Sequence, residues 1–209
     1  LGVTETAVIA AAYDSDKGPL VIADYADNPG AGGYGDSTEL LHALIKAGVT
    51  NACFGPMVDR GAAQALHATA VGQRVQIALG GKTDPSFGGG PLAVEGELVS
   101  VSDGRFTGDG PMIHGLSGSF GLSAVLRVDG IDILVVSRAR QILDLQQFKA
   151  FGIDPQKKHV VVLKSMQHFR AAFEPIAGQV IVCDSGALCT PRYNRLPYRN
   201  VPRPIFPLD

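Results

Sequence analysis

Four glycines lie in one short loop of this 209-residue chain, between an apolar run and an amphipathic stretch. Gly30, Gly32, Gly33 and Gly35 permit positive φ angles and let backbone amides approach a ligand without Cβ atoms in the way. An anion, or an oxyanion that develops during a reaction, is the ligand such amides favour. The loop therefore predicts an anion-binding segment, and a turn that only caps a helix stays open as the alternative.

Three of these glycines also satisfy the G-x-G-x-x-G pattern of dinucleotide-binding folds, and Asp59 lies about 20 residues further on. Two features disfavour a nucleotide-dependent oxidoreductase. Asp36 would place a carboxylate at the helix N-terminus where a pyrophosphate should lie, and Asp27-Asn28-Pro29 separates the strand from the first glycine. No Lys-Ser or Lys-Thr follows the loop, so the pattern does not indicate a P-loop either.

A second polar cluster, Lys164-Ser165-Met166-Gln167-His168, lies at a predicted turn from strand to helix. Ser165 is the predicted helix cap, and Gln167 and His168 are predicted to face outward. His168 could serve as an acid, a base or an oxyanion donor, or could simply hydrogen-bond a neighbouring loop. Lys164 could neutralise a bound anion or could be a solvated lysine at the end of a strand.

Lys82, in Gly80-Gly81-Lys82-Thr83, could bring an ammonium group to the same crevice, although a turn with a surface lysine also explains it. A hydrolytic zinc site needs about three His, Asp or Glu ligands and one open position. The histidines are scattered, without H-E-x-x-H or H-x-H. We therefore predict no metal ligands and no bound cofactor in this chain alone.

The composition narrows the class of protein. A net charge of -2 and no basic stripe disfavour nucleic acid as a partner, and 45% hydrophobic residues suffice for a sizeable core. No uninterrupted apolar run of about 18 residues and no signal-peptide pattern occur, which predicts a cytoplasmic protein without membrane contact. An odd number of cysteines without C-x-x-C predicts reduced, structural thiols at Cys53, Cys183 and Cys189.

Strand and helix patterns alternate at both ends of the chain. The predicted elements are strand 19–23, a helix from an Asp36–Glu39 capping box to Gly48, strand 49–54, a helix capped by Asp59 that runs to Gly72, strands 74–79 and 92–101, a hairpin of 123–128 and 131–136, helix 145–151, strand 159–163, helix 166–173 and strand 179–183. The Asp129-Gly130 pair marks the hairpin turn.

These patterns predict one α/β domain over residues 1–209. Its mixed sheet has parallel strand-helix-strand units at both ends and an antiparallel middle section. A Pro- and Arg-rich tail, 186–209, is expected to be extended, and its Ile205-Phe206 pair suggests docking. Loops at the carboxyl ends of parallel strands converge on the ligand crevice, so we expect 24–37, 55–59, 164–168 and 184–186 to meet there.

Five motifs occur in order along the chain: Ala26-Asp27-Asn28-Pro29-Gly30, Gly35-Asp36-Ser37-Thr38, Gly80-Gly81-Lys82, the run from Lys164-Ser165-Met166 to Phe173, and Leu196-Pro197-Tyr198-Arg199 with Arg203-Pro204-Ile205-Phe206. Together they resemble the C-terminal domain of microcystinase C (MlrC)-like proteins, from about Val21 to the last residue. The resemblance implies a zinc metallopeptidase that hydrolyses an amide bond, in a family named for microcystin degradation.

In that family the zinc ligands belong to an N-terminal domain that precedes the matched region. The resemblance therefore implies that the N-terminal domain of the same protein is absent here. That domain is the expected partner of this chain, and the chain alone is expected to be inactive. A first residue other than methionine, Leu1, fits this expectation. A homo-oligomer is a further expected partner state.

The resemblance also assigns roles across an interdomain cleft. We predict that His168 is the catalytic residue and that a small peptide or amide substrate, or its oxyanion, is contacted by Asp27, Asn28, Gly30, Gly32, Gly33, Asp36, Ser37, Lys82, Lys164 and Gln167. Tyr34 and Ser185 depart from the family pattern, which leaves the choice of substrate open. A noncatalytic module that binds an anion or carboxylate for a partner protein is the alternative.

Overall fold

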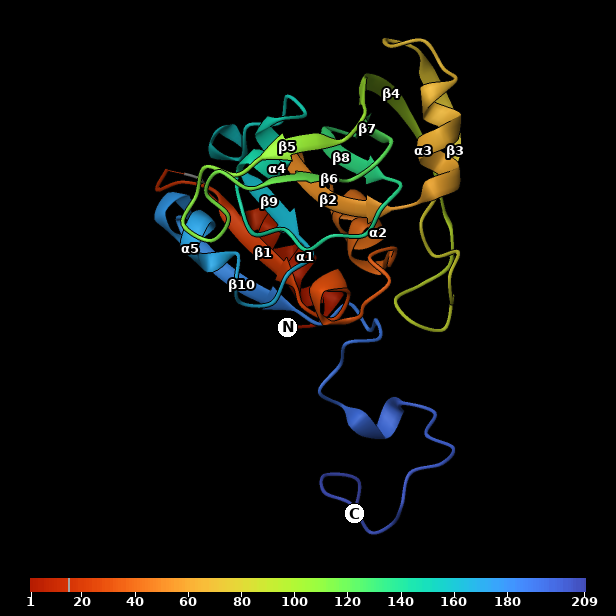
Figure 1. Ribbon diagram of the computed structural model, residues 1–209. Helices are drawn as coiled ribbons and strands as arrows, with labels where there is room; N and C mark the ends of the chain where they lie inside the picture. Colours follow the sequence, from red (N-terminus) through yellow and green to blue (C-terminus); the bar gives the residue numbers. More distant parts are fainter. Residues whose placement is uncertain (15) are drawn as a thin grey trace.

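The computed structural model describes residues 1–14 and 16–209 and contains one eight-stranded sheet in the order β10-β1-β9-β2-β8-β7-β4-β3 (Figure 1). Its strands are β1 (Leu20–Asp24), β2 (Ala52–Val58), β3 (Arg74–Leu79), β4 (Leu92–Ser102), β7 (Ser123–Val128), β8 (Ile131–Val136), β9 (Val160–Leu163) and β10 (Gln179–Cys183). Two short strands, β5 (Arg105–Thr107) and β6 (Ser117–Ser119), form a separate antiparallel pair.

The sheet is mixed, as predicted. Strands β10, β1, β9, β2 and β8 are parallel, and β8, β7, β4 and β3 are antiparallel. Every residue of β1 and β9 is buried, which explains why these strands are continuous apolar runs: a parallel strand is covered on both faces. The antiparallel strands come from the middle of the chain, and in space they form one side of the sheet.

The helices cover both faces of this sheet. They are α1 (Val3–Ala12), α2 (Glu39–Lys46), α3 (Arg60–His67), α4 (Gln146–Lys149) and α5 (Arg170–Phe173), with 3-10 turns η1 (Pro29–Ala31), η2 (Pro155–Lys157), η3 (Glu174–Ile176) and η4 (Tyr193–Arg195). Leu20 and Ile22 of β1 belong to the core beneath α1, α2 and α3. Val21 and Ala23 face the core that contains α4 and α5. The alternation follows from the two-residue period of a strand.

Several predicted boundaries are confirmed. The hairpin strands β7 and β8 have the predicted limits, and Asp129 (φ 46°) and Gly130 (φ 83°) form their turn. Asp59 caps α3, because its Oδ1 accepts a hydrogen bond from the amide of Ala62 at 2.9 Å. Strand β3 also lies at its predicted residues.

Two predicted helix starts are wrong. Asp36 does not form a capping box with Glu39: Thr38 precedes α2, and Asp36 Oδ2 accepts from the amides of Lys82 (3.1 Å) and Thr83 (2.9 Å). The helix predicted for 166–173 begins only at Arg170. Ser165 does not cap it, because this buried hydroxyl accepts a hydrogen bond from Gln141 instead.

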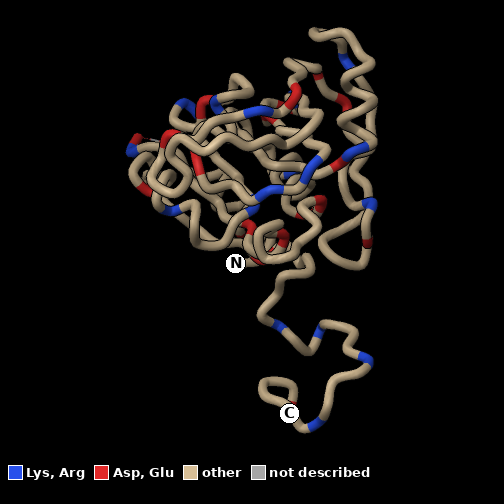
Figure 2. The backbone as a smooth tube through the Cα atoms, in the orientation of Figure 1, with Lys and Arg blue, Asp and Glu red and all other residues tan. Residues whose placement is uncertain are grey.

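The chain leaves the body of the molecule after Thr190, and the arm (residues 191–209) reaches away from the sheet (Figure 1). Within it only η4 is regular, as expected for a proline-rich tail. Basic positions recur along the arm in Figure 2.

Cys53, Cys183 and Cys189 are free thiols, and burial raises the pKa of Cys183 to about 12. Among the described residues, no helix has the length and apolar character needed to cross a membrane.

Candidate functional site

The loops that follow the parallel strands meet at one edge of the sheet, as predicted; we call it the carboxyl edge. The amide of Lys164, after β9, donates to the carbonyl of Gly55 in β2 at 3.1 Å. The amide of Val58 donates to Gly35 O at 2.9 Å, which ties β2 to the loop after β1. Side chains of the loops after β1, β2, β8, β9 and β10 therefore share this edge.

A buried ion pair lies beneath the glycine loop. Lys164 is fully buried, and its Nζ contacts the carboxylate of Asp27, which is 1% exposed. The same ammonium donates to the carbonyls of Gly35 and Ser37, each at 3.0 Å. Asp27 also accepts from the amides of Gly35 (2.8 Å) and Ser37 (2.7 Å). The anion that these loop amides hold is thus the chain's own Asp27.

The amides of the other three glycines of this loop are also bonded internally. Asn28 accepts from Gly30 through its side chain and from Gly33 through its carbonyl, both at 2.9 Å, while Gly32 donates to Pro29 O at 3.3 Å. Gly30 and Gly32 are exposed, whereas Gly33 is buried. Asp27, Ser37 and Lys164 lie below this surface, so a direct contact of any of them with a substrate stays a prediction.

Asp24 extends the buried cluster toward β10. Its Oδ1 accepts from the hydroxyl of Ser185 at 2.7 Å, and its Oδ2 lies 3.4 Å from the hydroxyl of Ser37. Burial raises the pKa of Asp24 to about 6, while the charge of Lys164 acts in the opposite direction. Desolvation is the larger effect, and the negative charge of Asp27 raises the pKa of Asp24 further.

Lys82 is brought to the carboxyl edge, but it pairs with the chain's own carboxylate. Its Nζ donates to Asp59 Oδ2 at 2.6 Å, and Gly80 N donates to the same oxygen at 3.0 Å. The Lys82 side chain is 44% exposed, so it reaches the surface beside Asp36. Its role in substrate binding remains a prediction.

His168 and Gln167 are exposed, as predicted. His168 Nδ1 lies 3.5 Å from Nε2 of Gln141, and that Nε2 donates to Ser165 Oγ at 2.8 Å. Gln141 was not singled out by any sequence pattern; the only signal was its place in the loop that follows β8. Gln167 is turned along the chain, since its Oε1 accepts from Arg170 at 2.7 Å.

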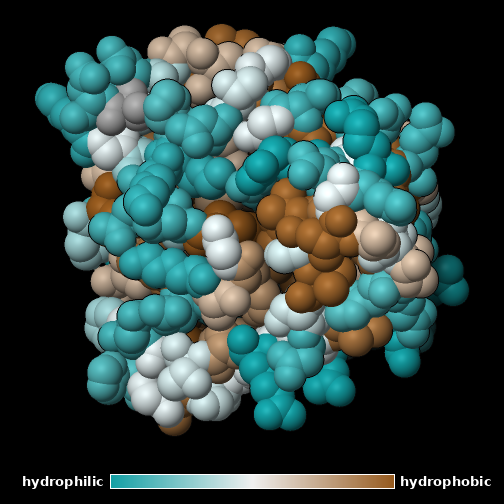
Figure 3. Space-filling view, turned by 90° about the horizontal axis from the view of Figure 1, so that it is seen from above, coloured by the Kyte–Doolittle hydropathy of each residue, from teal (hydrophilic) through white to brown (hydrophobic). Residues whose placement is uncertain are grey.

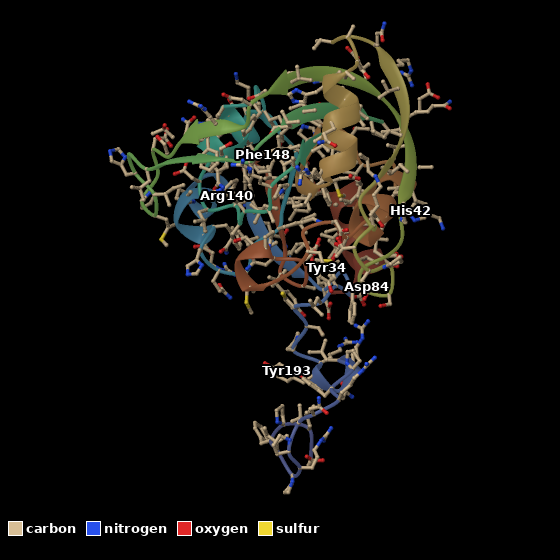
Figure 4. All side chains as sticks on the ribbon, turned by 45° about the vertical axis from the view of Figure 1, so that its right-hand side comes forward. Tyr34, His42, Asp84, Arg140, Phe148 and Tyr193 are labelled. Atoms are coloured by element: carbon tan, nitrogen blue, oxygen red, sulfur yellow. The ribbon has the colours of Figure 1, made fainter. Side chains whose placement is uncertain are left out.

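Gly30 packs closely against the side chain of Gln141. A Cβ atom at Gly30 would lie 2.2 Å from Gln141 Oε1, so a larger residue here would displace the end of the Gln141 side chain. The two residues line a cavity of about 310 Å³, which we call the Gln141 cavity. Its other main walls are Phe106, Ile113, Leu116, Leu143 and Arg140. Figure 4 shows Arg140 and Tyr34 on the body of the molecule, apart from Tyr193 on the arm.

The described part of the chain contains no group of three or more His, Cys, Asp or Glu side chains placed to hold a metal ion. The acidic residues of the carboxyl edge are instead satisfied by Lys164, Lys82, backbone amides and serine hydroxyls. The residues present at this edge therefore do not suit a metal centre.

Comparisons with known proteins identify a family, a relative and a solved structure that are similar to this chain. The family model described as the MlrC C-terminus matches residues 22–200. Microcystinase C from a Sphingomonas species is 28% identical over 208 residues, which cover 98% of this chain and 38% of that protein. A crystal structure from Mesorhizobium sp. BNC1, provisionally assigned as a metallopeptidase, matches the whole chain with a TM-score of 0.88 and 26% identity. The match covers 41% of that chain, so this chain spans about 40% of the length of these relatives.

Proposed function

The chain belongs to the MlrC C-terminal domain family, and from this premise we propose that it forms the substrate-binding part of a zinc-dependent amide hydrolase. Support comes from two relatives, one named microcystinase C and the other assigned provisionally as a metallopeptidase. Both are more than twice as long as this chain. We assign the zinc to the part of the full-length protein that lies outside the match, because the described residues do not suit a metal.

The observation that carries the proposal is that Gly30 and Gln141 line one cavity at the carboxyl edge and that His168 lies next to Gln141. Open α/β sheets bind ligands at this edge. An apolar group of the substrate would lie against Phe106, Ile113 and other apolar walls of the Gln141 cavity.

His168 is the residue of this chain best placed for proton transfer. It is exposed, and Gln141 lies beside its Nδ1 while being held by Ser165. A histidine imidazole takes up and releases a proton near neutral pH, so it can protonate the amine that leaves when an amide bond breaks. Gln167 and Lys82 are proposed to contact the substrate around it.

The buried cluster gives this surface its shape. Lys164 and Asp27 bind the backbone on both sides of Gly35, and Asn28 fixes Gly30. We therefore propose a positioning role for Asp27, Asn28, Ser37 and Lys164, with Gly30 and Gly32 as the part of the loop that reaches the substrate. The carboxylate of Asp36 positions Lys82, because it accepts a hydrogen bond from the backbone amide of Lys82.

The test uses the full-length protein. Metal content is measured first, and hydrolysis of small peptides, including linearised microcystin, is followed before chelation, after chelation and after zinc is restored. Loss and recovery of activity with zinc would support the proposal. Unchanged turnover by the metal-free protein would refute the zinc-dependent mechanism, and peptide binding without turnover would favour the noncatalytic carboxylate-binding module.

A further inference from the structure

A second cavity, of about 570 Å³, lies at the same edge of the sheet, and no role has been assigned to it. Arg60, Arg105 and Arg138 line it, together with Asp103, Gln64 and Ser119. We call it the arginine pocket. Figure 2 shows basic positions at the start of α3 and along the loop that follows β8, which are two of its walls.

The arginine pocket is electropositive in a chain whose net charge is -2. Among the described residues that line it, Asp103 is the only carboxylate, and it pairs with Arg105 at 3.1 Å. Arg60 and Arg138 form no ion pair within residues 1–14 and 16–209. Two guanidinium groups are thus available to an anion, and a guanidinium fork suits a carboxylate in particular.

The backbone brings these two arginines together. Arg60 begins α3 directly after β2, and Arg138 follows the neighbouring parallel strand β8. The amide of Asp59 donates to Val136 O at 2.8 Å, which joins the ends of the two strands. Gly121 (φ 70°) makes room for Arg138, because a Cβ there would lie 3.0 Å from Arg138 Cγ.

The arginine pocket adjoins the Gln141 cavity. Arg140 lines the Gln141 cavity, and its Nε donates to the carbonyl of Ser119 at 3.0 Å. Ser119 is itself a wall of the arginine pocket. One extended molecule can therefore reach both cavities along the carboxyl edge, with an apolar group in one and an anionic group in the other.

The walls of the two cavities differ in character: those of the Gln141 cavity are mainly apolar, and those of the arginine pocket are polar and basic. The face seen from above in Figure 3 has apolar side chains at its centre and hydrophilic ones around them. Two neighbouring cavities of opposite character favour a ligand that carries both kinds of group.

We infer that the arginine pocket is a specificity subsite that binds a carboxylate of the substrate through Arg60 and Arg138. The inference rests on the proposed function, because this subsite lies at the same edge of the sheet. Arg60 and Arg138 are specificity residues in this view, and the catalytic group lies elsewhere.

The experiment uses the full-length, zinc-loaded protein and pairs of fluorogenic hexapeptides that differ only by Glu or Gln at one position, varied along the peptide. At one position, the Glu peptide should have a KM about tenfold lower than the Gln peptide. Arg60→Gln and Arg138→Gln should each remove most of this preference while leaving kcat and the Gln peptide nearly unchanged.

Arg74→Gln is the matched control. This arginine is 69% exposed and pairs with Glu95 beside a separate cavity that contains Asp129, the turn residue between β7 and β8. Its substitution should leave the Glu preference intact. Added salt should raise the KM of the Glu peptide alone, because screening weakens charge recognition.

Equal KM values for the Glu and Gln peptides at every position would overturn the inference, as would equal effects of the arginine substitutions on both peptides. If neither peptide is hydrolysed, the proposed function fails separately. Calorimetric binding of the same peptides then decides the role of the pocket: a Glu preference that depends on Arg138 supports it, and absence of that preference refutes it.

Discussion

At the scale of single residues, the Lys164–Asp27 pair dominates the carboxyl edge. Both side chains are removed from water, and the pair is bonded to both sides of Gly35. Charges buried in this way are tolerated only while each has its partner, because an unpaired buried charge is costly. The pair therefore gives the glycine loop one conformation and makes that loop sensitive to either substitution.

Lys164→Met should destabilise the fold by about 3 to 5 kcal/mol, because it leaves Asp27 buried without its counter-ion. The double variant Asp27→Asn with Lys164→Met should recover part of that loss. Urea unfolding of the two variants and of the parent protein measures the difference. A single variant that unfolds at the parent's urea midpoint would show that the pair does not hold the loop.

The raised pKa of Asp24 predicts that the free energy of unfolding depends on pH. Its folded pKa of about 6 exceeds the unfolded value of about 3.9, so the folded state binds more protons between these values. This contribution to the free energy of unfolding is most favourable below about pH 4 and is lost as the pH rises through 6. Asp24→Asn cannot ionise, so its stability relative to the parent should rise by up to about 3 kcal/mol from pH 4 to pH 7.

Urea unfolding at pH 4, 5, 6 and 7 tests this difference, which isolates Asp24 from other titrating groups. Asp16→Asn removes a carboxylate from the exposed surface and controls for the change in net charge. A constant difference between Asp24→Asn and the parent across this range would contradict the expectation.

At the scale of elements, the glycines of one loop divide into two kinds. A Cβ at Gly35 (φ 75°) would lie 2.5 Å from Val58 Cγ2, whereas nothing lies within 4 Å of a Cβ at Gly32 (φ 93°). Both positions disfavour a side chain through their backbone angle, but only Gly35 is also closely packed.

Gly35→Ala should therefore be more destabilising than Gly32→Ala, by about 1 to 3 kcal/mol, because overpacking adds to the cost of the backbone angle. The two variants change the same atoms in the same loop, so each controls for the other. Their thermal midpoints provide the measurement. Equal midpoints would mean that the loop relaxes away from Val58 without cost.

Most strands of the sheet could be predicted from the sequence, because their signals are local. Strand β9 is an apolar run, and the hairpin has both alternating strands and an Asp-Gly turn. Helix α1 was not predicted: it buries only Thr6, Ala7 and Ala10, so its sequence has no strong apolar face. Helix α5 is shorter than predicted, because Ser165 bonds to Gln141 rather than capping it.

The candidate site could be predicted only in part. The convergence of the loops follows from parallel topology, which the sequence indicates. The bonding of the loop amides does not, because Asp27 and Lys164 are 137 residues apart and meet only once β1 and β9 are paired. Gln141 lies in a loop without a pattern, so its contact with Ser165 emerged only from the fold.

At the scale of the whole molecule, the arm extends away from the sheet (Figure 1). Its apolar side chains are unusually open to water: Phe206 is 90% exposed, and Tyr193, Tyr198 and Ile205 are between 42% and 45% exposed. The arm begins beside the glycine loop, since the amide of Cys189 donates to Ala26 O at 2.8 Å. A metal-binding domain that covers the carboxyl edge would therefore meet this arm.

We predict that the remainder of the full-length protein covers the arm. Burying a side chain such as Phe206 stabilises by about 1.5 to 3 kcal/mol, so amides 193–206 should exchange hydrogen at least about tenfold more slowly in the full-length protein than in this chain. Phe206→Ser should restore fast exchange in the arm but not at Asp129-Gly130, the turn on the opposite edge of the sheet. Equally fast exchange of the arm in both proteins would show that it makes no such contact, and the partner domain would then have to approach the carboxyl edge without it.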